Sequence, residues 1–196
     1  MIPMKCWPYA RRGIENAADP PEPVDDTRRS HVRERLMSKQ ILGLFAWLVV
    51  TFIAAAVGAF ASAQAASFYG ELARPSWAAP ASWFGPVWSV LYVMMAVAVW
   101  AVWRVPLGVR TRTPLVLFLL QLAANALWSW LFFAWRLGGL AFADVVVLLA
   151  LIAATLVSFW KVKRLAGALL LPYLCWVGFA TALTWSVWQS NPALLR

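Results

Sequence analysis

The chain of 196 residues is 63% hydrophobic and only 13% charged, with a formal net charge of +9. A soluble domain carries about 25% charged and about 45–50% apolar residues, so this composition excludes an ordinary soluble globular protein. The basic excess does not indicate a nucleic-acid partner, because its distribution along the chain matches a membrane topology.

Residues 1–40 form a separate region ahead of the first long apolar run. The proline-rich, acidic stretch Asp19–Asp26 precedes the basic stretch Arg28–Lys39, and large apolar residues are sparse. Such a composition cannot bury enough surface to fold alone, so we expect a disordered cytoplasmic tail, either dispensable or a partner-binding arm. It lacks the apolar core of a secretory signal peptide, and a translation start at Met37 is an alternative.

Long apolar runs separate the charged residues over the rest of the chain. Crossing a hydrocarbon core of about 30 Å takes about 20 helical residues, a length that each run reaches. Continuous apolarity favours helices over the alternating strands of a membrane barrel. We therefore predict an all-α integral membrane protein, with a bundle of five transmembrane helices over residues 41–196. The expected spans are Ile41–Ala63, Phe84–Trp103, Pro114–Trp135, Leu140–Trp160 and Ala166–Trp188.

Lysine and arginine are divided unevenly between the two sides that five spans create. The tail and the loops near Val105–Thr113 and Lys161–Leu165 carry 14 of them, and the opposite side carries only Arg74, Arg136 and Arg196. This bias follows the positive-inside rule and places the N terminus in the cytoplasm if the protein lies in an inner membrane. The basic residues are therefore topology signals first and contacts for anionic membrane lipid second.

The longest connection between the expected spans is Gln64–Trp83, on the side with few charges. Its stretch Arg74–Pro80 combines prolines with a tryptophan. Because proline fixes its own backbone angle and lacks an N–H, we expect an ordered non-helical flap here rather than a floppy linker.

Tryptophan is unusually frequent, with 14 in the chain. An aromatic belt at the membrane surfaces explains those at the ends of expected spans, which are Trp83, Trp103, Trp135, Trp160 and Trp188. Trp128 and Trp176 instead lie well inside their spans, and Trp88 lies one turn inside. An indole in hydrocarbon needs a partner for its N–H or a cavity in which a ring can stack on it.

Helical spacing puts these inner tryptophans on the same helix faces as polar and small side chains. The faces defined in this way contain Trp88, Tyr92, Asn125, Trp128, Tyr173, Trp176, Ala180 and Thr184. They either line a ligand cavity or pack between helices, and spacing alone does not separate the two interpretations.

Asp144 is the one carboxylate inside an expected span. A charge there costs on the order of a few kcal/mol unless it is paired or faces a cavity. The simpler interpretation is an interhelical hydrogen bond, with Asn125 or a tryptophan N–H as partner, and the alternative is contact with a ligand or a proton. A single acid without an intramembrane base argues against a proton-coupled pump.

The residues that several kinds of site require are missing from the sequence. The only histidine, His31, lies in the tail, so a haem iron held between the spans would need Cys175, a methionine or a tyrosine. Cys6 and Cys175 provide no disulfide framework. The chain also lacks paired carboxylates, a nucleophile–histidine pair and a glycine-rich phosphate loop, which argues against hydrolase and kinase chemistry. We predict no catalytic residue, no metal site and no required cofactor.

Four stretches combine prolines, aromatics and amides in a distinctive order: Arg74–Pro80, Phe84–Tyr92, Gln121–Phe133 and Pro172–Leu183. In this order they resemble the TspO/translocator-protein family, also known as tryptophan-rich sensory protein or peripheral-type benzodiazepine receptor. The resemblance covers about residues 37–191. It implies a five-helix bundle, often a homodimer, with a ligand cavity near the first loop.

Members of that family bind porphyrins such as protoporphyrin IX, haem, and isoquinoline or benzodiazepine drugs. By position, Trp88 and Trp176 match the tryptophans that flank the ligand, and other cavity or near-cavity positions match Tyr92, Asn125, Asp144 and Ala180. Thr184 stands where asparagine is common in the family. The sterol-binding pattern of animal members lacks its tyrosine and its basic residue here, so sterol binding by that route is not expected.

The resemblance therefore implies binding of protoporphyrin IX, of haem without histidine ligation, or of another planar apolar ligand. We expect the ring to lie between Trp88 and Trp176 beneath the flap, with Arg74 meeting a propionate. The bound state then serves a tetrapyrrole sensor or carrier in porphyrin handling and stress responses, a light- and oxygen-dependent porphyrin-degrading protein, or a small-molecule exporter. The small residues Ala54, Gly58 and Ser62 permit close helix contact, across a dimer or inside one bundle.

Overall fold

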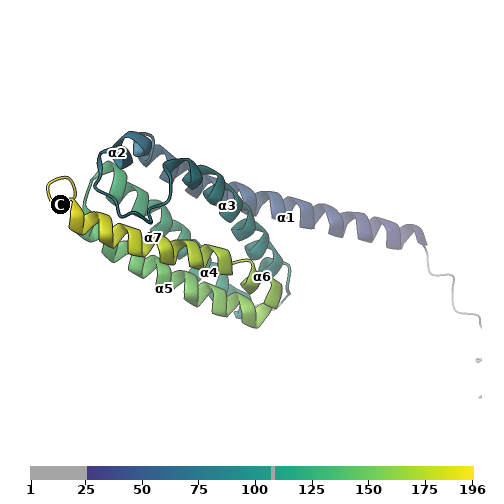
Figure 1. The fold of residues 1–196 in the computed structure, drawn as a ribbon. Helices are drawn as coiled ribbons and strands as arrows, with labels where there is room; N and C mark the ends of the chain where they lie inside the picture. The colour runs from purple at the N-terminus through teal and green to yellow at the C-terminus, as the bar shows by residue number, and fades with distance from the viewer. Residues whose placement is uncertain (1–25, 107–108) are drawn as a thin grey trace, which may run out of the picture. The chain divides into compact units, whose positions relative to one another are not determined.

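The computed structural model describes residues 26–106 and 109–196, and they form helices joined by short connections (Figure 1). No strand occurs in these two ranges. In chain order the helices are α1 (Asp26–Ala61), α2 (Ala65–Glu71), α3 (Ala81–Trp103), α4 (Val109–Ser129), the π-helix η1 (Trp130–Ala134), α5 (Gly138–Val162), α6 (Arg164–Ala168) and α7 (Leu171–Ser190).

Five helical segments among the described residues are long and apolar enough to cross a membrane. They are Arg29–Ala61, Ala81–Trp103, Arg112–Ala134, Gly138–Val162 and Arg164–Ser190. The predicted all-α class and the five spans are confirmed. The helices extend a few residues beyond most of the predicted limits, and the first span begins at Arg29 rather than Ile41. These extensions arise because a formed helix adds a residue at its end at little cost, whereas a new helix must first nucleate.

Residues 26–40, part of the predicted tail, form the first part of α1, which begins at Asp26. This stretch is rich in arginine, glutamate, leucine, methionine and lysine, all good helix formers, and it continues directly into the apolar helix. The rest of the predicted tail, residues 1–25, lies outside the described residues. The boundary between two compact units of the chain falls between Lys39 and Gln40.

In the unit from Gln40 onward, α5 packs closely along α4 and α7, and α3 packs against α4, α5 and α6. One buried cluster fills the middle of this bundle and the end near α6, with Met95, Phe118, Ile152 and Phe159 fully enclosed. A smaller cluster occupies the opposite end, where α2 and the C-terminal segment lie (Figure 1). The space between the two clusters is where a cavity forms.

The connection between α1 and α3 differs in part from the prediction. It contains the short helix α2, and the non-helical part, here named the flap, runs over residues 72–80. The Asn191 side chain accepts a hydrogen bond from the Ala73 N–H (2.8 Å) and donates one to the Ala73 carbonyl (2.9 Å). The Tyr69 hydroxyl donates to the Ala79 carbonyl (3.0 Å). These three bonds fasten the flap at both ends to α7 and α2.

The end of α4 widens into the π-helix η1. The Trp135 N–H bonds to the Trp130 carbonyl (2.8 Å), five residues back, and Arg136 then adopts a left-handed backbone conformation with φ of 55°. Such π segments are rare and occur often at functional sites. Here the widened turn places Phe132 and Phe133 beside the cavity described next.

Candidate functional site

A cavity of about 490 Å³ lies between the α2 end of the bundle and its central cluster. Its walls come from α1, α2, α3, α4, η1 and α7. The volume falls within the range of about 300–1,000 Å³ that is usual for sites that bind small organic molecules.

Short side chains on one wall create this space. The α1–α2 wall is made mostly of Ala55, Gly58, Ala59, Ser62, Ala63, Ala65 and Ala66, and aromatic rings form much of the rest. A Cβ built on Gly58 would approach Ser129 of α4 to 3.2 Å, so α1 lies close to α4 at this point. The strip of Ala54, Gly58 and Ser62 therefore packs at least in part inside one bundle, where two of its members line the cavity.

All three inner tryptophans singled out from the sequence line the cavity. The Trp88 ring lies 5.6 Å from that of Tyr92 at 32°, and the Trp176 ring lies 5.9 Å from that of Phe84 at 69°. Trp128 also lines the cavity and stacks on Phe132, at 5.2 Å and 12°. The walls therefore present several broad aromatic faces to one space.

A chain of hydrogen bonds supplies the polar part of the wall. The Tyr92 hydroxyl donates to Asn125 Oδ1 (2.6 Å), and Asn125 Nδ2 donates to the Tyr173 hydroxyl (3.1 Å). Tyr92 and Asn125 line the cavity, while Tyr173 is fully buried behind them and does not. Tyr173 thus orients the Asn125 amide from behind the wall, since it accepts from the amide nitrogen.

Two indole N–H groups at the cavity are buried without an acceptor. Within the described residues, Nε1 of Trp128 and Nε1 of Trp176 have no hydrogen-bond partner. A buried donor left unpaired costs about 1–3 kcal/mol, so these groups favour a ligand that carries acceptors.

Arg74, which was expected to meet a propionate from the flap, is not among the residues that line the cavity. Its guanidinium carbon lies 4.6 Å from the centre of the Tyr69 ring, and Tyr69 does line the cavity. Burial raises the pKa of Tyr69 above its ordinary value, and the nearby guanidinium offsets part of that rise. The hydroxyl is therefore protonated at neutral pH and available to hold the flap. None of the described residues that line the cavity is charged, and Arg74 is separated from it by one ring.

Asp144 also lies outside the cavity lining, and the predicted hydrogen bond to Asn125 or to a tryptophan is not formed. Asn125 instead pairs with the two tyrosines, and Asp144 Oδ2 is buried with no partner among the described residues. The buried face of α5 passes through Val145, Leu148 and Ile152, which leaves Asp144 on its flank.

The structure thus brings seven of the ten predicted residues together around one cavity: Trp88, Tyr92, Asn125, Trp128, Trp176, Ala180 and Thr184. The prediction missed Tyr69, Phe84, Phe133 and the small residues of α1 and α2. The density of alanine, glycine and serine over residues 54–66 was a usable signal, because such a run cannot fill the space beside large aromatics. Of the side chains considered as iron ligands, only tyrosines line the cavity, since Cys175 and the described methionines do not.

Comparison with known proteins identifies related sequences. The sequence profile of the TspO/MBR family matches residues 45–189. The chain is 36% identical to the tryptophan-rich protein TspO of Chlorobaculum tepidum over 164 residues, covering 80% of this chain and 100% of the relative. It is 37% identical to the human translocator protein, covering 67% and 79%, and 38% identical to protein CrtK of Rhodobacter capsulatus, covering 77% and 94%.

Proposed function

The chain belongs to the TspO/MBR family and is a multi-pass integral membrane protein, and from this premise we propose that it binds a planar tetrapyrrole such as protoporphyrin IX. In this proposal the ring lies in the cavity walled by Trp88 and Trp176, and the protein serves as a membrane sensor or carrier in porphyrin handling. If the protein lies in an inner membrane, this proposal places its N terminus in the cytoplasm.

One observation carries the proposal: two indoles from different helices face the same apolar cavity of about 490 Å³. A porphyrin is a flat aromatic macrocycle, and each well-placed aromatic pair contributes about 0.5–1.5 kcal/mol beyond the burial of its area. The unpaired indole N–H groups add donors at the same place. A site of this kind favours a wide planar ring over a flexible chain.

The absence of charge among the described lining residues constrains how an anionic porphyrin binds. An unpaired carboxylate inside the cavity is costly, so the propionates must point out of it. Arg74, beside Tyr69 at the α2–flap end, is the cation placed to receive one through a charge-assisted hydrogen bond. Haem would bind in the same pose through contacts of its ring with the aromatic walls, without a histidine ligand.

Replacing Trp176 or Trp88 by leucine tests the proposal. Because each change removes one stacking face, we expect the Kd for protoporphyrin IX to rise by about tenfold while the far-UV circular dichroism stays the same. The measurement is a titration of the porphyrin absorbance in detergent. Trp160→Leu, an exposed position on α5 away from the cavity, is the matched control and should leave the Kd unchanged.

An unchanged Kd in both cavity variants would refute stacking by the two indoles. Illumination of the complex addresses the role of binding, because a new spectral product that depends on the protein indicates porphyrin degradation rather than sensing. Flux of porphyrin across sealed vesicles would indicate export.

A further inference from the structure

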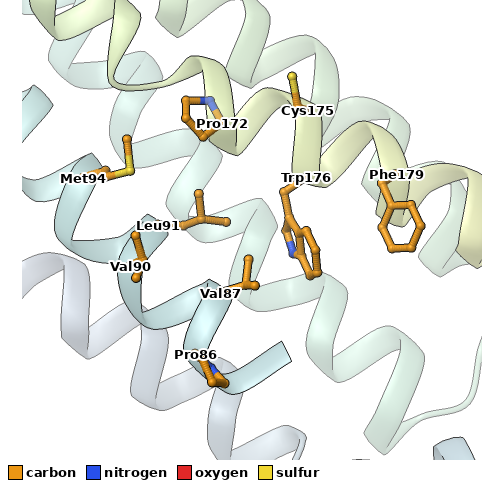
Figure 2. Close-up of a pocket in the computed structure, with 9 residues that line it drawn as sticks. All are labelled: Pro86, Val87, Val90, Leu91, Met94, Pro172, Cys175, Trp176 and Phe179. Atoms are coloured by element: carbon orange, nitrogen blue, oxygen red, sulfur yellow. The ribbon is translucent and has the colours of Figure 1, made fainter. Parts of the chain in front are cut away.

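A second hollow lies on the outer face of the bundle, between α3 and α7. It is a groove of about 630 Å³ whose lining includes Val87, Val90 and Met94 on α3 and Cys175, Trp176 and Phe179 on α7 (Figure 2). Val90 and Cys175 are exposed on the surface of the bundle. For a membrane-spanning bundle this surface faces hydrocarbon, so the groove opens sideways into the bilayer.

Trp176 belongs to both hollows. It is the only described residue that lines the groove and also lines the cavity. Figure 2 shows its indole projecting from α7 toward α3, beside Val87. On the cavity side its ring meets Phe84, and on α7 it meets Phe179 at 5.5 Å. Side chains therefore separate the groove from the cavity, and the Trp176 indole lines both of them.

Beside this indole the backbones of α3 and α7 are not packed closely against each other. The close packing of α3 is with α4, α5 and α6, and that of α7 is with α5, so α3 and α7 meet only sparsely. Pro86, which lines the groove, lies inside α3 and lacks the N–H that would continue the helical hydrogen bonds. The Trp176 N–H has no partner within the described residues that would restrain the ring. Packing contacts, among them those with Phe84 and Phe179, therefore hold this side chain without the help of a hydrogen bond from its N–H.

We propose that the α3–α7 groove is a lateral portal and that Trp176 is its gate. The occupant is the planar apolar ligand of the cavity, which partitions into the bilayer, enters the groove and passes Trp176. This inference rests on the proposed function, because it requires the cavity to bind such a ligand. It goes beyond that function by naming the route and the phase from which the ligand comes.

Obstruction of the groove outside the cavity tests the portal. The chain has two cysteines, so a Cys6→Ser variant leaves Cys175 as the single thiol, and a bulky maleimide attached there fills the groove. Val90→Trp is an independent obstruction at an exposed position. The measurement is stopped-flow association and dissociation of protoporphyrin IX with the full chain in lipid nanodiscs.

A blocked route raises the barrier in both directions. We therefore expect both rate constants to fall by about tenfold, while the Kd changes by less than about twofold. The control carries the same maleimide on the exposed α5 residue Val157, in a Cys6→Ser/Cys175→Ser/Val157→Cys variant, and should bind at the unmodified rate.

Unchanged rates in both obstructed proteins would overturn the portal and leave the groove as a site for bilayer lipid only. Equal slowing in the Val157 control, or a change confined to the dissociation rate, would also overturn it. The proposed function fails in a distinguishable way, since it is refuted if the unmodified protein shows no saturable porphyrin binding.

Discussion

Asn125 shows how a single buried amide organises this cavity. Its oxygen accepts from Tyr92 and its nitrogen donates to Tyr173, so it joins α4 to α3 and α7. In a membrane an unpaired polar group is especially costly, because no water is present to replace the partner. The two tyrosine hydroxyls satisfy the amide locally, and Asp144 is left without the partner that the sequence suggested.

Arg74 is the residue from which we expect the proposed site to gain a preference for anions. Replacing it by glutamine removes the charge but keeps a hydrogen-bonding side chain of similar length. Since charge-assisted hydrogen bonds are worth about 1.5–3 kcal/mol, we expect the Kd for protoporphyrin IX to rise by about tenfold or more. The Kd for its dimethyl ester, which carries no propionate charge, should stay the same.

Arg196→Gln is the control for Arg74→Gln, because Arg196 is an exposed arginine at the same end of the bundle. It should leave both affinities unchanged. Equal weakening of the acid and the ester by Arg74→Gln would show that Arg74 acts through the Tyr69 ring rather than through a propionate.

The flap lies at the α2 end of the bundle and is held in place by contacts with other elements. Residues 72–80 contain prolines and no helix, but they are tied to α7 by Asn191 and to α2 by Tyr69. Trp77 of the flap also meets Phe179 of α7, with ring centres 5.8 Å apart. The flap and the gate residue Trp176 thus share Phe179 as a neighbour.

Asn191→Ala tests this attachment. The change removes both bonds to Ala73 and a third that Asn191 donates to the Val187 carbonyl. Because each such bond contributes about 0.5–1.5 kcal/mol, we expect hydrogen exchange at the Ala73 amide to accelerate by about tenfold or more. Gln189→Ala, an exposed change at the same helix end, should leave this exchange unchanged. Undiminished protection in Asn191→Ala would show that ring contacts alone order the flap.

At the scale of the whole bundle, the two ends differ in charge. The end where α3 leads to α4 and α5 leads to α6 carries Arg104, Arg112, Lys161, Lys163 and Arg164. The opposite end, with α2, the flap and the C terminus, carries Arg74, Arg136 and Arg196. The helix order therefore agrees with the charge division predicted for five spans, since the same groups of basic residues share an end.

This asymmetry predicts that the flap end faces away from the cytoplasm when the protein lies in an inner membrane. In a Cys6→Ser/Cys175→Ser background, a membrane-impermeant thiol reagent applied to intact cells should label Ser76→Cys in the flap. Lys161→Cys at the basic end should be labelled only after lysis. The reverse pattern would contradict the assigned orientation.

The number of spans and the all-helical class were predictable from the sequence alone. The sequence also indicated that Trp88 and Trp176 would line one cavity. Each span depends on a local property, because about 20 consecutive apolar residues are needed wherever hydrocarbon is crossed. Trp176 was recognisable because it sits too deep in its span for an interfacial belt, and Trp88 was recognisable from its helical spacing to Tyr92 and from the family resemblance.

The tertiary structure decided which helix faces meet, and this separated the members of the site from their neighbours. Arg74, Asp144 and Tyr173 are predicted site residues that stand outside the cavity lining. Arg74 lies on the flap over the Tyr69 ring, Asp144 lies on the flank of α5, and Tyr173 lies behind Asn125. The groove between α3 and α7 could not be predicted from the sequence, because it too depends on which helix faces meet. A cavity depends on what the facing helices fail to fill, and that is a property of packing rather than of any one segment.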